Sequence, residues 1–371
     1  MPTEPGDFGT LSNNLVFFTV VAYSLAMLGF AAALSFRRSA AARRPASAAA
    51  PVRVSAAAGS RVLVGASAAP APAPTPAPTP APEDSFAGSG QPARPAGPEH
   101  WVQGRPAEGP PPAASPSRLA RIAGGLALAL TVLGWLAHLA AIVARGVAAD
   151  RLPWGNMYEF SLAVSFAAVT VFLYLVLRRG MSHLGVFVML PVVLYLGHAA
   201  MVLYVAPGPL IPALQSYWMR IHVTGAIVAS GAFMIATVPM VLYLVRLRYD
   251  ERTAAGRRTG PSAVARLLPS ADALDAAAYR VVVFAFPVWT FAVIAGAIWA
   301  EVAWGRYWGW DPKETWSFIT WVGYACYLHA RSTAGWRGKR AAYIGLLAFV
   351  ALLIDYYGVN MVVSGLHSYA K

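Results

Sequence analysis

Charged residues are scarce in this sequence: Asp, Glu, Lys and Arg make up 12% of its 371 residues, and apolar residues make up 57%. A soluble domain carries charge on roughly a quarter of its residues, so this chain has too little to cover a water-facing surface. Apolar runs of about 20 residues recur along it, and each can cross a hydrocarbon core of about 30 Å. The composition excludes an ordinary soluble domain and predicts an all-α, polytopic integral membrane protein, because an unclosed sheet cannot cross hydrocarbon.

Cysteine and lysine are also rare. The single cysteine, Cys326, lies in an apolar run, which excludes an internal disulfide, a Cys-x-x-Cys redox pair and a thiolate metal cage within this chain. The net charge of +13 comes almost wholly from arginine. Most of these arginines lie in the linkers between apolar runs, which indicates membrane orientation and argues against nucleic-acid binding.

The apolar runs predict about eight transmembrane helices. They cover about residues 14–35, 119–143, 158–177, 184–205, 221–247, 279–300, 312–330 and 341–357. Glu4 and Asp7 precede the first run and Arg37 and Arg38 follow it, the reverse of a secretory signal peptide. We therefore expect an uncleaved first span with its N-terminus outside, and alternation then places the C-terminus outside as well.

The distribution of Lys and Arg tests this orientation, because short cytoplasmic loops are enriched in both. The linkers assigned to the inside hold 23 of them and the outer segments hold 6. Without the long first linker, the inner linkers still hold 13. The split favours the topology with both termini outside.

Composition divides the chain into three parts. Residues 1–38 carry the first helix, and residues 119–371 carry a seven-helix membrane domain. Between them, residues 39–118 are rich in Ala, Pro, Ser and Gly. Such a tract cannot bury enough apolar surface to offset its chain entropy, so we expect a disordered cytoplasmic linker.

Tryptophan is concentrated in one outer segment. The loop at 301–316 holds Trp304, Trp308 and Trp310, interleaved with glycines such as Gly305. An interfacial aromatic belt accounts for one or two of these indoles but not for so many in so short a window. Because glycines let flat surfaces approach closely, a wide planar apolar ligand stacked on the indoles fits better.

Two outer loops also read as capped helix starts. Asp311 suits an N-cap before a proline, with Glu314 as the capping-box partner. Asp311 thus has two interpretations, helix cap or ligand contact. In the loop at 151–161, Asn156 suits a cap and Glu159 follows three residues later.

Three histidines are candidate metal ligands, because histidine is the commonest ligand of haem iron. His222 and His367 fall at the same membrane face as the tryptophan-rich loop. A lone histidine is more often a hydrogen-bonded structural residue, but two at one depth beside these indoles indicate axial ligation. His329 lies 17 residues into its helix, about 25 Å deeper and near the inner leaflet. Its partner is not assured within this chain, so a second subunit is a candidate source.

The segment Trp304-Gly-Arg-Tyr-Trp308-Gly-Trp310-Asp311 resembles the WGxxWxWD signature of haem-handling proteins in cytochrome c maturation. The Pro-Lys-Glu-Thr-Trp continuation, the Pro-x-x-Asn-Met-Tyr-Glu loop, Tyr-Trp-x-x-Ile-His222 and Gly-Leu-His367-Ser-Tyr together resemble the CcsA/ResC branch of System II, named CcsB in some bacteria. The resemblance covers about residues 120–371 and leaves out the linker. The signature alone also occurs in the ABC-linked maturation system.

The resemblance implies a multi-pass protein of the bacterial plasma membrane that works with a ResB/Ccs1-type membrane protein. Such proteins carry haem b outward and present it for thioether attachment to apocytochrome c, whose Cys-x-x-Cys-His motif supplies the thiols. The pair would form a cytochrome c haem lyase, or holocytochrome c synthase. The positions expected to contact the porphyrin are Trp304, Gly305, Trp308, Trp310 and Asp311, and those expected to ligate iron are His222, His367 and, within the membrane, His329.

Other functions stay open beside the synthase subunit. One is a haem exporter or carrier without attachment activity, another a haem-handling subunit of the ABC-linked system, and a third a membrane scaffold with an aromatic belt. A c-type cytochrome is excluded because the chain has no Cys-x-x-Cys-His. Arg220 and Arg306 are candidates for the haem propionates, since guanidinium suits carboxylates, or are interfacial anchors.

Overall fold

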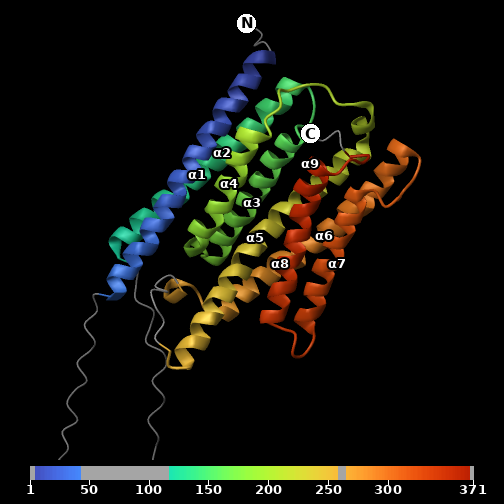
Figure 1. Cartoon of the computed structure of the whole chain (residues 1–371). Coiled ribbons are helices and arrows are strands. Elements are labelled where there is room, and N and C mark those ends of the chain that lie inside the picture. The colour runs from blue at the N-terminus through green and yellow to red at the C-terminus, as the bar shows by residue number, and fades with distance from the viewer. Residues whose placement is uncertain (1–4, 43–116, 258–264, 368–371) are drawn as a thin grey trace, which may run out of the picture. The chain divides into compact units, whose positions relative to one another are not determined.

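Long helices make up almost all of the computed structural model, which describes residues 5–42, 117–257 and 265–367 (Figure 1). Those residues contain no strand, so the all-α prediction is confirmed for the part of the chain that the structure describes. Residues 43–116, which hold nearly all of the expected linker, lie outside it. In chain order the elements are α1 Pro5–Ala42, α2 Arg118–Ala149, α3 Met157–Arg179, η1 Ser182–Leu184, α4 Gly185–Val202, η2 Pro212–Gln215, α5 Tyr217–Ala254, η3 Ala265–Leu267, α6 Ala271–Trp304, α7 Pro312–Ser332, α8 Lys339–Leu353, the π-helix η4 Ile354–Val359 and α9 Asn360–Val362.

Seven stretches among the described residues are helical, long and apolar enough to cross a membrane, which confirms a polytopic membrane protein. They are Asp7–Phe36, Arg118–Ala149, Met157–Arg179, Ser182–Val202, Tyr217–Ala254, Ala271–Trp304 and Lys339–Val362. The eighth expected span, α7, has 21 residues but is the least apolar of the long helices. Its composition rather than its length therefore sets it apart.

The helices pack as a bundle around α5. α1 pairs with α2, α5 with α6, and α7 with α8; α3 and α4 connect the first pair to α5, and α8 also packs against α5 (Figure 1). α5 is the most deeply buried span. Small residues allow helices to approach closely inside a membrane. Those buried on α5 are Gly225, Ala226, Ala229, Ser230, Gly231, Ala232 and Ala236.

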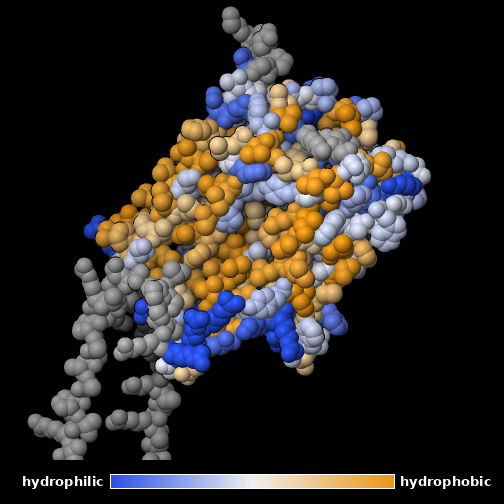
Figure 2. All heavy atoms as spheres, viewed as in Figure 1, coloured by the Kyte–Doolittle hydropathy of each residue, from blue (hydrophilic) through white to orange (hydrophobic). Residues whose placement is uncertain are grey.

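The sequence assigns four segments to the outside, about residues 145–157, 206–220, 301–311 and 358–371, and their described parts meet at one end of the bundle. Arg145, at the end of α2, hydrogen-bonds to the main-chain oxygen of Val205. The Trp299 indole, near the end of α6, donates to the oxygen of Ala213 at 2.9 Å. The remaining contact joins His367 to Asp311. Figure 2 shows an apolar band over the middle of the bundle and hydrophilic residues at its ends.

Candidate functional site

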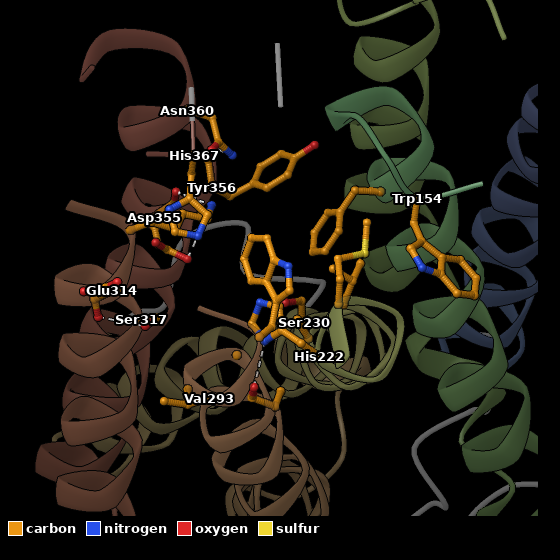
Figure 3. A pocket seen from close by; sticks show the side chains of 18 of the residues that line it. Trp154, His222, Ser230, Val293, Glu314, Ser317, Asp355, Tyr356, Asn360 and His367 are labelled. Atoms are coloured by element: carbon orange, nitrogen blue, oxygen red, sulfur yellow. Dashed lines mark hydrogen bonds and ion pairs between the residues drawn. The ribbon is translucent and has the colours of Figure 1, made fainter. Parts of the chain in front are cut away.

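A cavity lies at the end where these segments meet. It holds about 1470 Å³ of empty space, part of it open to solvent, and its walls come from the helices α3 to α8, from the outer loops, and from η4 and α9. His222 and His367 both line it. In Figure 3, Asp355 and His367 lie on one side of the pocket and Trp154 on the other, with His222 and Ser230 between them. The structure therefore brings the two predicted outer histidines to one hollow.

Both imidazoles contact the same indole, that of Trp299. The His222 ring is nearly parallel to it, with centroids 5.9 Å apart and an interplanar angle of 14°. The His367 ring meets it edge-on at 5.7 Å, and lies 4.9 Å from the Trp304 ring. Trp299 is 3% exposed and held by its bond to Ala213. A buried indole thus fixes the spacing of two histidines from distant parts of the sequence.

The hydrogen bond of His222 sets its tautomer. Its Nδ1 lies 2.7 Å from the main-chain oxygen of Ala292 on α6. That oxygen can only accept, so Nδ1 carries the proton and Nε2 carries the lone pair. Gly296, one turn further along α6, makes room for the ring: a Cβ there would lie 2.6 Å from Nδ1. In the neutral ring, this bond leaves Nε2 as the nitrogen that is able to bind a metal.

His367 is oriented by a carboxylate instead. Its Nδ1 donates to Oδ2 of Asp311 at 3.0 Å, and the N–H of Leu366 donates to Oδ1 at 2.9 Å. Burial lowers the pKa of His367 to about 4, although the Asp311 bond favours the protonated ring. Burial also tends to raise the pKa of Asp311, but the bonds from Leu366, His367 and Lys313 outweigh it and lower that pKa. At neutral pH this is a neutral imidazole beside a carboxylate, the usual arrangement of a metal-ligating histidine.

The N-cap interpretation of Asp311 is confirmed, and the same side chain also holds His367. It accepts from the N–H of Lys313 at 3.3 Å and, with Glu314, completes a capping box. Glu314 is 8% exposed, and its carboxylate accepts hydrogen bonds from three groups of the loop. These are the N–H of Gly309 at 2.8 Å, the N–H of Asp311 at 3.1 Å and Nη1 of Arg306 at 3.0 Å. The loop is thus folded around one buried carboxylate.

The predicted porphyrin contacts take different places. Trp304 and Trp308 line the cavity. Trp310 does not, being 65% exposed with a positive φ of 59°. Gly305 ends α6 with a φ of 69° and is exposed. Asp311 does not line the cavity itself and is linked to it by its hydrogen bond to His367. The indoles that line the cavity at this end therefore include Trp299, Trp304 and Trp308.

The loop before α3 is built in a similar way. Asn156 accepts from the N–H of Glu159 at 2.9 Å, which confirms it as an N-cap. Glu159 is fully buried and binds Arg145 at 3.0 Å and Arg151 at 2.7 Å, as well as the N–H of Gly155 at 2.9 Å. This network positions the wall that carries Trp154 and contacts neither histidine.

Three other candidates lie away from the cavity. His329 is in the last turn of α7 with its side chain exposed. Arg306 is engaged with Glu314, and exposed Arg220 lines a separate hollow beside Arg151. Within the described residues no group of three or more His, Cys, Asp and Glu could hold a metal ion.

Sequence reasoning did not assign three further cavity residues. Trp299 lies just before the tryptophan-rich loop in the sequence, and it contacts both histidines. Gly296 and Lys313 also line the cavity. Gly296 sits in an apolar helix with no local signal, whereas Lys313 could have been noticed as a lysine beside the signature.

Comparison with known proteins agrees with the motif. Residues 154–367, more than half of the chain, match the family described as Cytochrome C assembly protein. The chain is similar to the cytochrome c biogenesis protein CcsA of Trieres chinensis, 36% identical over 250 residues, which is 61% of this chain and 80% of that one. For CcsA of Guillardia theta the identity is 32% over 252 residues (64% and 83%), and for that of Gloeobacter violaceus 34% over 275 (62% and 81%). The chain therefore belongs to the cytochrome c assembly protein family, and its role lies in cytochrome c maturation.

Proposed function

We propose that this protein is the haem-handling subunit of a System II cytochrome c haem lyase. It receives haem b from the cytoplasmic side, holds it at the outer cavity and presents it for thioether attachment to apocytochrome c. The observation that carries this proposal is the pair of neutral imidazoles, His222 and His367, set against one buried indole. Their hydrogen bonds favour Nε2 as the ligating nitrogen in both.

The residues of the cavity divide the work of holding haem. The two histidines supply axial ligands, which satisfies the iron and keeps it from side reactions. Trp299, Trp304 and Trp308 offer apolar faces and edges for the porphyrin. The chain supplies no thiol pair, so the two thiols that add across the vinyl groups come from the Cys-x-x-Cys-His segment. Its histidine then replaces one of the chain's own axial ligands, which releases the product.

His329 belongs to a second, deeper site in this proposal. Its exposed position in the last turn of α7 suits a ligand shared with another membrane protein. A ResB/Ccs1-type partner packed on this side would supply the opposing ligand. An ionisable residue facing lipid is costly, which favours a covered position in the complex. The orientation with both termini outside a bacterial plasma membrane places the deep site inside and the cavity outside.

A reconstitution tests the proposal. The purified chain with its ResB/Ccs1-type partner is given haem and an apocytochrome, and covalent product is detected as haem that remains on the cytochrome after acid–acetone extraction. We expect product with the wild type and little or none with His222→Ala or His367→Ala. An apocytochrome carrying Ser-x-x-Ser-His is the control that should accept no covalent haem.

The same assay separates the alternatives. Haem that passes to the apocytochrome but remains extractable identifies a carrier without attachment activity. Retention of haem and full product formation in both histidine variants contradicts the ligand assignment. A scaffold with an aromatic belt predicts no haem absorption in any preparation.

A further inference from the structure

A single cation lines the cavity among the residues that the structure describes. It is Lys313, in the first turn of α7, two residues after the carboxylate that orients His367. The other basic side chains that the structure describes at this end do not line it: Arg306 is paired with Glu314, Arg145 and Arg151 are paired with Glu159, and Arg220 lines the separate hollow. The rest of the lining is mostly apolar and includes two carboxylates, those of Glu314 and Asp355, so Lys313 is the group there that suits an anionic ligand.

The ammonium has room for another acceptor. Its Nζ donates to the main-chain oxygen of Asp355 at 2.9 Å, the one hydrogen bond that it makes to the described residues. It lies 3.7 Å from Oδ2 of Asp355, beyond a normal hydrogen bond, and 6.0 Å from the centre of the Tyr356 ring. An ammonium carries three donors, so at least one remains for a ligand.

Asp355 is buried in a way that stability alone does not explain. It is 4% exposed and lines the same cavity, and its Oδ1 has no hydrogen-bond partner among the described residues. Replacing a buried ion pair with apolar residues of similar volume often leaves a protein equally or more stable, and an unsatisfied buried oxygen adds a further cost. The π-helix η4 places this residue, and such bulges often occur at functional sites.

We propose that Lys313 binds the propionate edge of the porphyrin. Asp355 competes for the same ammonium group, so that propionate binding remains reversible. The inference rests on the proposed function and names the part of the cavity that orients its cargo. Haem has both propionates on one edge. A propionate bound at Lys313 turns that edge toward α7 and η4 and leaves the vinyl groups away from them. Arg220 and Arg306, the propionate partners suggested by their sequence positions, have no such access.

Titration with two porphyrins tests this directly. The full chain, purified in detergent, is titrated with ferric haem and with haem dimethyl ester, in which both propionates are esterified. We expect the wild type to prefer haem over the ester by about tenfold or more, the ordinary range for a hydrogen bond between charged groups. Lys313→Met should remove that preference by weakening haem alone. Unchanged affinity for the ester shows that the cavity has kept its shape.

Two further variants sharpen the result. Asp355→Asn removes the competing charge with little change of shape, so it should tighten haem and leave the ester unaffected. Arg220→Met removes a cation at the same end of the bundle but outside the cavity, and should leave the preference intact.

Several outcomes overturn the inference. One is a preference for haem that persists in Lys313→Met, and another is equal loss of both porphyrins, which makes Lys313 structural. Loss of the preference in Arg220→Met assigns the anchor to that arginine. If the wild type binds neither porphyrin with a low-spin spectrum, the proposed function itself fails, and the inference falls with it.

Discussion

The loops before α3 and α7 share a construction but hold different things. Each runs from a Trp-Gly pair through a side-chain N-cap to a buried glutamate, which receives the N–H of the glycine and an arginine. In one loop the glutamate is Glu159, with Gly155 and Arg151; in the other it is Glu314, with Gly309 and Arg306. The common part is thus a device for folding an outer loop against the start of a helix.

The caps distinguish the two loops. Asn156 accepts one bond, from the helix that it begins. Asp311 begins its helix and also holds His367 and the N–H of Leu366. For the buried glutamates, the α3 loop has more ion pairs than the α7 loop: Glu159 is paired with two arginines and Glu314 with one. The α3 loop is therefore the stronger frame, and the α7 loop carries the ligand-orienting function.

The largest expected effect is the loss of stability when the charge of a buried glutamate, Glu159 or Glu314, is removed. Glu159→Gln leaves two arginines at a buried site without a counter-charge, and should lower the free energy of unfolding by about 3–5 kcal/mol. Glu314→Gln should cost less, about 1–3 kcal/mol, because Arg306 is 32% exposed. Denaturant unfolding in detergent measures both. Exposed Glu251→Gln is the control, with a change below about 0.5 kcal/mol. A greater loss in Glu314→Gln than in Glu159→Gln reverses the ranking of the two frames.

Gly296→Ala breaks the site and leaves both loops untouched. The added Cβ would lie 2.6 Å from Nδ1 of His222, so the ring must move off the Ala292 oxygen. We expect haem affinity to fall about 10–100-fold, as for loss of other groups that orient a metal ligand. Equilibrium titration followed at the Soret band measures it. Gly197→Ala, where a Cβ meets nothing within 4 Å, is the matched control. Equal affinity in the two variants would mean that His222 is not a ligand.

Exchanging the caps tests the comparison itself. Asp311→Asn keeps a good N-cap but replaces the carboxylate beside His367, so haem affinity should fall about tenfold with little loss of helix stability. The reduction potential of the bound haem should rise, because the histidine loses a negative neighbour. Asn156→Asp should change neither quantity. Redox titration of the two variants provides the check, and similar shifts in both would deny Asp311 its special role.

The α7 loop has one residue more than the α3 loop at this point: Trp310 lies between Gly309 and the N-cap Asp311. It is exposed and touches Trp308 and Phe318 at centroid distances of 5.7 and 6.2 Å. Trp310→Ala should therefore lower haem affinity by less than about threefold, within the range of a single aromatic contact. Trp304→Ala should lower it more, because that ring contacts His367. The opposite order, from the same titrations, would return Trp310 to the binding surface.

The sequence predicted what depends on local pattern. Apolar length predicted the seven described spans that are apolar enough to cross a membrane, and the residue types around Asp311 and Asn156 predicted both caps. Alternation of the spans placed His222 and His367 at one end of the bundle. Helix depth placed His329 at the far end of α7, because the rise per residue is fixed, and the structure has it in the last turn.

The rest depended on rotation and packing, which no local pattern records. Trp299 reads as one more interfacial tryptophan until α5 and α6 pack so that it contacts His222. Gly296 is one small residue among many until a ring from another helix needs its space. Lys313 and Asp355 are 42 positions apart and meet only because η4 lies beside α7. Arg220 and Arg306 show the reverse, plausible by position but turned away from the cavity.

The electron paramagnetic resonance spectrum of the ferric, haem-loaded protein tests the central assignment most directly. Two imidazole ligands give a low-spin signal. We predict this signal for the wild type and for His329→Ala at the outer site, with conversion to a high-spin signal in both His222→Ala and His367→Ala. A low-spin signal of unchanged shape and intensity in either of the last two variants would contradict the account.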